Sequence, residues 1–379
     1  MYPTYVPILR AKTGEFDAIK NLKGKYASAI CPFFEIPRIT EDTKKLKDLR
    51  ESSQLTKDYL KLIANGISSA NSSPSLFFDF FDWKADSYTE TGEHILSYMY
   101  RALTKKGITV YPVIGCDRWD ILDYQKALVG LDVSVETIYC LRIDSVSIDD
   151  ANDTNYFTEM LDEILNTLGL SPSQVIIMFD FGDVKNKSIV SISNDLTNLL
   201  NITKNFNFRN VMLAGCSFPI IINDAVKDTD STDFVVRKEM HVWKSIYSDL
   251  ASTIIFSDYG IRNPKGGDGI KAVHANGKIR YTIENKYFVA RGHSKQQGNK
   301  GAQMYDLARM VVNSPYFLGA SFSWGDEQIE KCSNMLIKGN PTQWISFDTN
   351  HHISYVIEEV LEFQRNYIGS RKLDKLLVK

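Results

Sequence analysis

The chain has 379 residues, 44% of them hydrophobic and 12% aromatic, and a formal net charge of −2. It can bury a large core, and its balanced charge gives no global field that would recruit nucleic acid or an anionic membrane. No stretch approaches the roughly 18 unbroken apolar residues of a membrane span, no secretion signal is recognised at the amino terminus, and the five cysteines are widely spaced and odd in number. We therefore expect a cytoplasmic protein with free thiols and no membrane partner.

Strand-like runs recur along the first 260 residues, each separated from the next by a helix-compatible stretch. Near-continuous Val, Ile and Phe are typical of strands covered on both faces, and alternation with helices implies parallel order. An open doubly wound sheet has the same pattern, but a count of eight favours closure. We predict a (β/α)8 TIM-barrel-like fold over residues 1–260. Its strands are expected at Tyr5–Leu9, Ser28–Glu35, Leu76–Asp82, Ile108–Ile114, Thr137–Asp144, Gln174–Phe181, Asn210–Ser217 and Thr253–Asp258.

Residues 261–379 break this rhythm, and we predict that they form an irregular α+β cap that packs on the barrel mouth. Glycines are frequent at the start of the segment, and a hairpin is expected around the turn Glu284-Asn285. The expected elements are strands at Lys278–Ile283 and Lys286–Ala290, and helices at about Gln303–Val312 and His352–Asn366.

Several of the strand-like runs end at a carboxylate. In a (β/α)8 barrel the carboxyl ends of the strands form the rim that carries active sites. Side chains alternate across a strand, so Arg142 is expected to face the barrel axis. The same count places four acids around it, and of Asp79 and Asp82 only one can point inward. The four predicted inward acids are Glu35, Asp144, Asp180 and Asp258.

Three interpretations of this ring compete. Two carboxylates could act as acid and base or nucleophile, as in glycoside hydrolysis. Carboxylates with a histidine could hold a divalent cation for phosphate-ester chemistry. The third interpretation is a buried ion network centred on Arg142, in which acids satisfy the barrel mouth or cap the following helices.

The histidines outside the predicted barrel add candidate ligands or proton carriers. His293 follows Arg291 and Gly292, and the pair His351-His352 precedes or begins the last helix. A helix amino terminus favours neutral imidazole, the form that ligates metals or accepts protons. Neighbouring histidines point in different directions, so one of the pair is expected to enter a site.

The segment 262–300 is basic and rich in glycine, with aromatic residues among its charges. This composition suits contacts with phosphate or a nucleic-acid backbone. The alternative is a solvated loop. Glycine-rich phosphate motifs and nucleophile-elbow patterns are not found in the sequence.

The chain resembles the beta protein family of phage satellites and prophages. The resemblance spans nearly the whole chain and implies a role in phage–host conflict, but it supplies no catalytic residues. The residues that carry it are Tyr5-Val-Pro-Ile-Leu9, Gly14-Glu-Phe16 with Asn21-Leu22, Pro32-Phe-Phe-Glu-Ile-Pro37, Arg291-Gly-His293, Phe322-Ser-Trp-Gly-Asp326 and His351-His352.

We expect the cap to fold over the mouth and complete a composite site. The expected catalytic residues are Glu35, Asp144, Asp180, Asp258, His293 and His352, and the expected ligand-binding residues are Arg142, Arg291, Trp324, Asp326 and His351. The leading hypothesis is a phage-conflict protein, in defence or in immunity to a neighbouring toxin, with an acidic cleft at the barrel mouth that binds a ligand or partner. The alternatives are a hydrolase of phosphate esters or glycosidic bonds, with a divalent cation as one option, and a nucleic-acid-binding module that uses residues 262–300.

Overall fold

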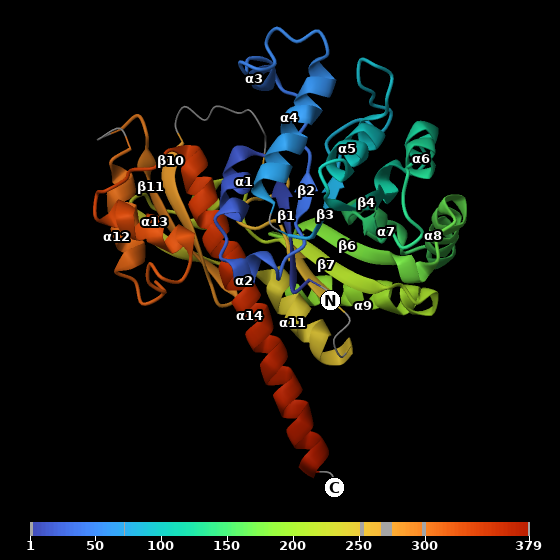
Figure 1. Cartoon of the computed structure of the whole chain (residues 1–379). Helices are drawn as coiled ribbons and strands as arrows, with labels where there is room; N and C mark the ends of the chain where they lie inside the picture. Colours follow the sequence, from blue (N-terminus) through green and yellow to red (C-terminus); the bar gives the residue numbers. More distant parts are fainter. Residues whose placement is uncertain (1–2, 72, 251–253, 267–274, 298–300, 378–379) are drawn as a thin grey trace.

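Eight parallel strands close into a barrel, which confirms the predicted fold class. The computed structural model describes residues 3–71, 73–250, 254–266, 275–297 and 301–377 (Figure 1). Each barrel strand pairs with the next along the chain, and β9 closes the ring between β7 and β1. The strands are β1 (Tyr5–Arg10), β2 (Phe33–Glu35), β3 (Ser75–Asp79), β4 (Thr109–Gly115), β5 (Tyr139–Ile143), β6 (Val175–Asp183), β7 (Asn210–Cys216) and β9 (Ile254–Asp258).

Alternation along the strands divides the apolar residues between two cores. Val6, Ile8 and Phe33 belong to the cluster that fills the barrel. Tyr5 and Leu9 belong to the larger cluster between the strands and the helices. The barrel interior is therefore a packed core, and polar groups that project inward can gather only towards its ends.

Helices connect the strands and cover the outside of the barrel. In α8, a stripe at helical spacing faces the strands, an Asp153 side chain caps the first turn, and Gly169 ends the helix in the left-handed conformation at φ 62°. The helices of the barrel region are α1 (Thr13–Lys20), α2 (Gly24–Ala27), α3 (Glu41–Lys44), α4 (Leu55–Ala70), α5 (Ile95–Thr104), α6 (Leu122–Val129), α7 (Ser145–Asp150), α8 (Thr154–Leu168), α9 (Ile189–Thr203), α10 (Ile222–Ala225) and α11 (Lys238–Leu250), with short 3-10 turns η1 (Cys116–Arg118), η2 (Pro172–Gln174) and η3 (Lys204–Phe206).

A three-stranded antiparallel sheet forms the centre of the cap. The predicted hairpin is present as β10 (Asn276–Ile283) and β11 (Lys286–Ser294), and Asn285 in its turn has a φ of 57°. The third strand, β8 (Ser231–Val236), was not anticipated and comes from the range assigned to the barrel. Its side chains are mostly exposed or half-buried, so it lacks the apolar run that marks the barrel strands. The cap sheet therefore takes one strand from the connection between β7 and β9.

Three helices complete the cap and join it to the barrel. They are α12 (Gln303–Val312), α13 (Trp324–Ser333) and α14 (Pro341–Leu377). Helices α12 and α13 pack over the cap sheet around Leu307, Ile329 and Phe347. The helix α14 contains the predicted segment 352–366 but begins earlier, lies against α1, and extends away from the rest of the chain at its carboxyl end (Figure 1). Among the described residues, no helix is long and apolar enough to cross a membrane.

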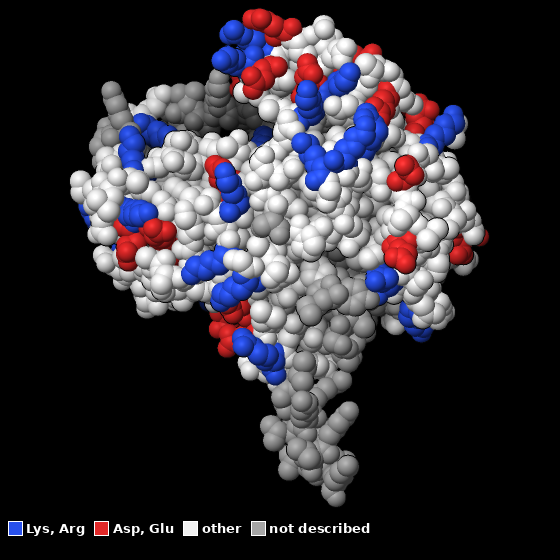
Figure 2. All heavy atoms as spheres, in the orientation of Figure 1, with Lys and Arg blue, Asp and Glu red and all other residues white. Residues whose placement is uncertain are grey.

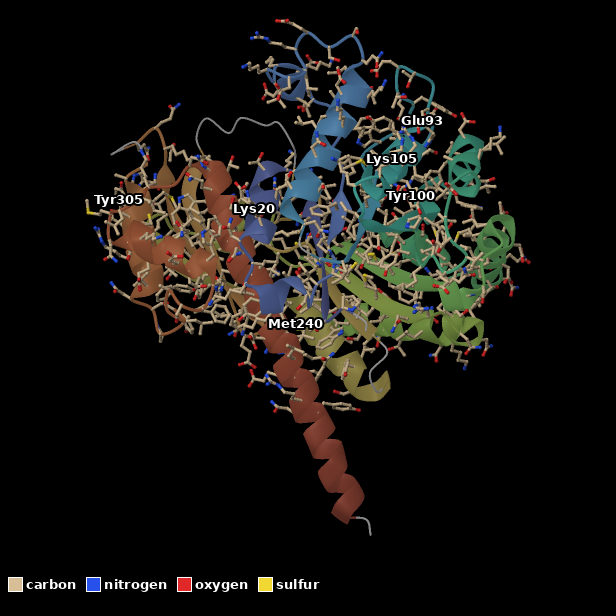
Figure 3. All side chains as sticks on the ribbon, in the orientation of Figure 1. Lys20, Glu93, Tyr100, Lys105, Met240 and Tyr305 are labelled. Carbon is tan, nitrogen blue, oxygen red and sulfur yellow. The ribbon has the colours of Figure 1, made fainter. Side chains whose placement is uncertain are left out.

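The surface charges agree with the balanced charge of the sequence, and the interior is filled with side chains. On the face drawn in Figure 2, basic and acidic side chains are interspersed. Figure 3 shows side chains filling the spaces between strands, helices and cap, with Met240 on α11 and Tyr305 on α12 marking the barrel and cap regions. The five cysteines are all buried free thiols, as the sequence predicts.

Candidate functional site at the barrel mouth

Arg142 lies at the centre of the barrel mouth and is fully buried. Its Nη1 donates to Asp79 at 2.7 Å, and its Nη2 donates to Glu35 at 2.8 Å. Both Nε and Nη2 donate to Asp180, at 2.9 and 2.6 Å, and Nη2 also reaches the hydroxyl of Tyr259 at 2.7 Å. The prediction that Arg142, Glu35 and Asp180 face the axis therefore agrees with the geometry.

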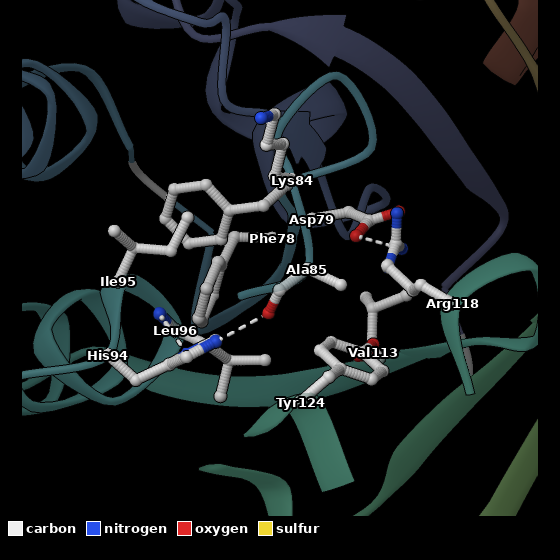
Figure 4. Close-up of a pocket in the computed structure, with 11 residues that line it drawn as sticks. Phe78, Asp79, Lys84, Ala85, His94, Ile95, Leu96, Val113, Arg118 and Tyr124 are labelled. Carbon is white, nitrogen blue, oxygen red and sulfur yellow. Dashed lines mark hydrogen bonds and ion pairs between the residues drawn. The ribbon is translucent and has the colours of Figure 1, made fainter. Parts of the chain in front are cut away.

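Of Asp79 and Asp82, between which the sequence left the choice open, Asp79 is the one that points inward. Asp79 is buried and bridges Arg142 to Arg118, whose Nη2 donates to it at 2.6 Å. Figure 4 shows the pair formed by Asp79 and Arg118. The side chain of Asp82 is 43% exposed and lies 3.7 Å from Arg10. Arg118 was not among the predicted site residues, because it follows β4 in a 3-10 turn whose side-chain direction strand alternation does not give.

The charged side chains of this network stabilise one another by pairing. Burial raises the pKa of Glu35, and the neighbouring Arg142 only partly offsets this effect. For Asp79, burial acts in the same direction, but Arg118 and Arg142 outweigh it and lower the pKa. A buried arginine that satisfies several carboxylates is the ion network expected as the third interpretation.

Asp144 does not join the Arg142 network. It is the N-cap of α7, where its carboxylate accepts from the backbone N–H groups of Val146 at 3.3 Å and Ser147 at 3.1 Å. The expectation that it faces the axis needs correction, because the strand ends at Ile143 and the alternation that orients Arg142 stops there. Asp144 is thus a helix cap.

Asp258 was expected on the barrel axis but lies on the outer face of β9. It shares that face with Ile254 and Phe256, which belong to the core between strands and helices. The pairing of these three residues on one face was right, and the choice of face was wrong. Tyr259, the next residue, projects inward instead and donates to Asp180 at 2.6 Å.

Asp258 forms a buried cluster with His352 of α14. The Nε2 of His352 lies 3.2 Å from each oxygen of Asp258, and Tyr5 donates its hydroxyl hydrogen to the same carboxylate. The Nδ1 of His352 lies 2.7 Å from Oγ1 of Thr282, a cap residue. Burial would raise the pKa of Asp258, but His352, Arg237 and the Tyr5 hydrogen bond lower it to about 2.

His351 forms a second, separate pair with Asp326. Its Nδ1 lies 2.9 Å from Oδ2 of Asp326, and its Nε2 lies 2.8 Å from the carbonyl oxygen of Thr282. Ser323 caps α13 by accepting from the Asp326 N–H at 3.1 Å. A Cβ on Gly325 would lie 2.3 Å from the carbonyl oxygen of Phe347, so this glycine permits close contact between α13 and α14. The Ser-Trp-Gly-Asp and His-His elements therefore hold the cap together.

The remaining predicted residues occupy other places. His293 lies 2.8 Å from the exposed carboxylate of Asp230, and Arg291 is buried with its Nη1 bonded to the carbonyl of Val226 at 2.8 Å. Trp324 packs edge-on against Phe347 at a ring-centroid distance of 5.2 Å. Among the described residues, no hydrogen bond or ion pair joins His293, Asp326 or His352 to Glu35 or Asp180. Of the predicted catalytic residues, Glu35 and Asp180 thus meet around Arg142, whereas Asp258 meets His352 in a separate cluster.

A small cavity borders Glu35 at the mouth, and one residue of α14 contributes to its lining. Its volume is about 20 Å³, enough for one or two water molecules. Glu35, Tyr259 and Arg10 line it from the barrel, and Thr349 lines it from α14. The hydroxyl oxygen of Thr349 is buried and has no hydrogen-bond partner among the described residues.

A larger acidic cleft, which we call the rim cleft, opens beside the Arg142 network at the carboxyl ends of β4 and β5. Its volume is about 330 Å³. Its lining residues come from η1 and the residues after it, from α7, and from one face of α8, and they include five acids and no Lys or Arg. They are Cys116, Asp117, Trp119, Asp120, Val146, Ser147, Asp150, Tyr156, Glu159, Met160 and Glu163.

Asp117 connects the rim cleft to the buried network, because it neighbours Arg118 at 3.4 Å. Burial raises the pKa of Asp117, and the negative charges of Asp79 and Asp144 act in the same direction, whereas Arg118 opposes them. Tyr156 and Val146 are 53% and 68% exposed. Sequence reasoning missed this cleft, although the helical spacing of Tyr156, Glu159 and Glu163 could have suggested an acidic face of α8.

The described residues do not support a metal site or a nucleic-acid interface on the basic segment 262–300. No group of three or more His, Cys, Asp and Glu side chains within the described part of the chain is arranged to hold a metal ion. Three arginines of the basic segment 262–300 have partners inside the protein: Arg262 pairs with Glu15, Arg280 with Asp348, and Arg291 with backbone carbonyls. Residues 267–274 and 298–300 of that segment lie outside the described residues.

Comparison with known proteins adds a family but no activity. No curated protein matches the chain. The family model described as Beta protein matches residues 5–358, which is nearly the whole chain. The match covers all eight barrel strands, the cap sheet and the first half of α14, up to residue 358. The chain therefore belongs to the Beta protein family.

Proposed function

We propose that this protein acts by binding, and that the rim cleft holds a basic segment of a partner protein. The observation that carries the proposal is the cleft itself, a cavity of about 330 Å³ with five carboxylates and no basic residue in its lining. It lies at the carboxyl ends of barrel strands, where functional sites of this fold are found. Exposed Tyr156 and Val146 add apolar contact area beside the acids.

Charge explains why a basic partner fits. Like charges around one cavity repel each other. The pKa of Asp117 is raised mainly by burial, and also by the negative charges of Asp79 and Asp144 behind the cleft, although Arg118 opposes this rise. Lys or Arg side chains of a partner would relieve the repulsion and add charge-assisted hydrogen bonds. The cellular role that we propose is phage–host conflict in the cytoplasm, either in defence or in immunity to a toxin encoded beside this chain. This role rests on the family resemblance.

The test is affinity purification from cells during phage infection, with identification of the captured protein. A variant with Asp117→Asn, Asp120→Asn and Glu159→Gln should lose the partner, and wild-type binding should weaken as salt rises. The control is Glu284→Gln with Glu362→Gln, which removes two exposed acids from another part of the surface. Equal capture by the wild type and the rim-cleft variant, or capture that salt does not affect, would contradict the proposal.

A hydrolase remains a second candidate for one reason. Glu35 lines the mouth cavity, only its Oε1 bonds to Arg142, and burial raises its pKa, which is the property of a general acid. The cavity is too small for a sugar or a phosphate ester unless the residues around it move. Glu35→Gln should abolish hydrolysis of generic phosphate-ester and glycoside substrates if this candidate is right. Activity that persists in this variant would exclude Glu35 as the acid.

A further inference from the structure

A second large cavity, which we call the α14 groove, lies where α14 passes the cap hairpin and α11. Its volume is about 360 Å³, within the range of small-molecule sites. The groove is on another part of the molecule from the rim cleft and shares no lining residue with it. Its lining residues are Lys244, Glu284, Leu318, Phe322, Tyr355, Glu358, Glu359, Glu362, Phe363 and Asn366.

Aromatic rings form part of the groove wall, and packing holds them in place. Phe322 contacts Tyr355 at a centroid distance of 6.4 Å and His351 at 5.8 Å. Phe363 packs against Trp243 at 5.5 Å and Tyr247 at 5.8 Å. The Lys244 ammonium already lies 5.8 Å from the centre of the Phe363 ring. The groove therefore contains fixed aromatic rings, one of which has a cation beside it.

The four glutamates of the groove fall into two classes. Glu359 binds Lys244 at 2.9 Å, and Glu358 binds Lys25 at 2.6 Å, so both have basic partners. Glu284 and Glu362 have no basic partner among the described residues; the one hydrogen bond to Glu284 comes from its neighbour Asn285 at 3.5 Å. Two exposed carboxylates thus remain uncompensated beside the aromatic rings.

The Tyr355 hydroxyl reports the same negative environment. Burial raises its pKa most, and Glu359, Glu284 and Glu362 act in the same direction, whereas Arg237 opposes them. A positive ligand would meet uncompensated carboxylates and the faces of rings, whereas an anion would meet repulsion from both.

We propose that the α14 groove binds a small alkylammonium cation that carries an apolar body. The rings supply apolar contact and cation–π attraction, and Glu284 and Glu362 supply the opposite charge. The cavity volume suits a ligand of this size. The proposal is independent of the rim cleft, so either can fail without the other.

Choline and its uncharged carbon isostere, 3,3-dimethylbutan-1-ol, test the proposal because they have the same shape and differ in charge. Ligand-observed NMR titration with the full chain should give saturable binding of choline and none of the alcohol. Equal binding of both compounds would show that charge plays no part and would overturn the proposal. The absence of saturable choline binding in the millimolar range would also overturn it.

Variants locate the site. Glu284→Gln with Glu362→Gln should weaken choline binding about tenfold, since the two carboxylates of the groove that have no basic partner among the described residues lose their charge. Asp117→Asn with Asp120→Asn is the matched control, because it removes two acids from the rim cleft, and it should leave choline binding unchanged. A loss in the control instead of the groove variant would overturn the assignment. Binding of a lysine-rich peptide without choline binding would assign the groove to a protein partner and contradict the proposal.

Discussion

His352 of α14 lies within 3.2 Å of Asp258 at the end of β9, and this contact fixes the cap to the barrel. The same imidazole reaches Thr282 of the cap sheet through its other nitrogen, at 2.7 Å. Its neighbour His351 points in another direction and contacts Asp326 inside the cap. Two consecutive histidines thus connect two layers of the fold, because successive residues on a helix project in different directions.

His352→Ala should lower the free energy of unfolding by about 3 kcal/mol, since it opens a cavity and leaves Asp258 without one of its partners. Urea unfolding at neutral pH measures this change. His241→Ala, which truncates a half-buried histidine on α11, serves as the control and should cost less. A variant as stable as the wild type would show that the His352–Asp258 contact does not hold the cap.

Arg142→Met should lower the free energy of unfolding by about 3 to 5 kcal/mol, because it leaves the buried Asp79 and Asp180 and the half-buried Glu35 without their shared cation. The measurement is chemical denaturation followed by circular dichroism. Arg50→Met is the control, since Arg50 makes an exposed ion pair with Glu51 that contributes little. If both variants were equally stable, the network would not contribute to the stability of the barrel.

Gly325→Ala should destabilise the protein by about 2 kcal/mol, because its Cβ would lie 2.3 Å from the backbone oxygen of Phe347. Gly24→Ala is a matched control: it lies in α2, and its added methyl group would meet no atom within 4 Å. Thermal unfolding of the two variants gives the comparison. Equal melting temperatures would show that α13 does not need its close approach to α14.

Glu239→Gln should change how stability depends on pH. Burial raises the pKa of Glu239 from 4.5 to about 7, so between these values the folded state binds more protons than the unfolded state. Stability from this group is therefore highest at low pH and falls by about 3 kcal/mol as pH rises through 7. The glutamine variant should lack this fall and exceed the wild type in stability at pH 8.

Unfolding free energies of both proteins at several pH values between 5 and 8 measure this difference. Glu136→Gln, at an exposed position, is the control and should follow the wild type. A difference between Glu239→Gln and the wild type that stays constant with pH would contradict a buried, titrating Glu239.

The strands and the direction of Arg142 could be predicted because both depend on local sequence. Continuous apolar runs marked all eight barrel strands, and alternation from Cys140 placed Arg142 on the axis. The hairpin turn could likewise be predicted from two residues, Glu284 and Asn285. For Asp144, alternation failed because the strand had already ended.

The sequence alone thus determined the barrel, the cap hairpin and the inward direction of Arg142. The spacing of apolar residues and the residue types in a turn are local properties of the sequence. Tertiary structure decided that Asp258 faces outward, because the choice between two faces depends on which layer packs there. It also decided that His351 and His352 bind partners in different layers. The rim cleft and the α14 groove exist only in three dimensions, because each is assembled from segments that meet only when the chain folds.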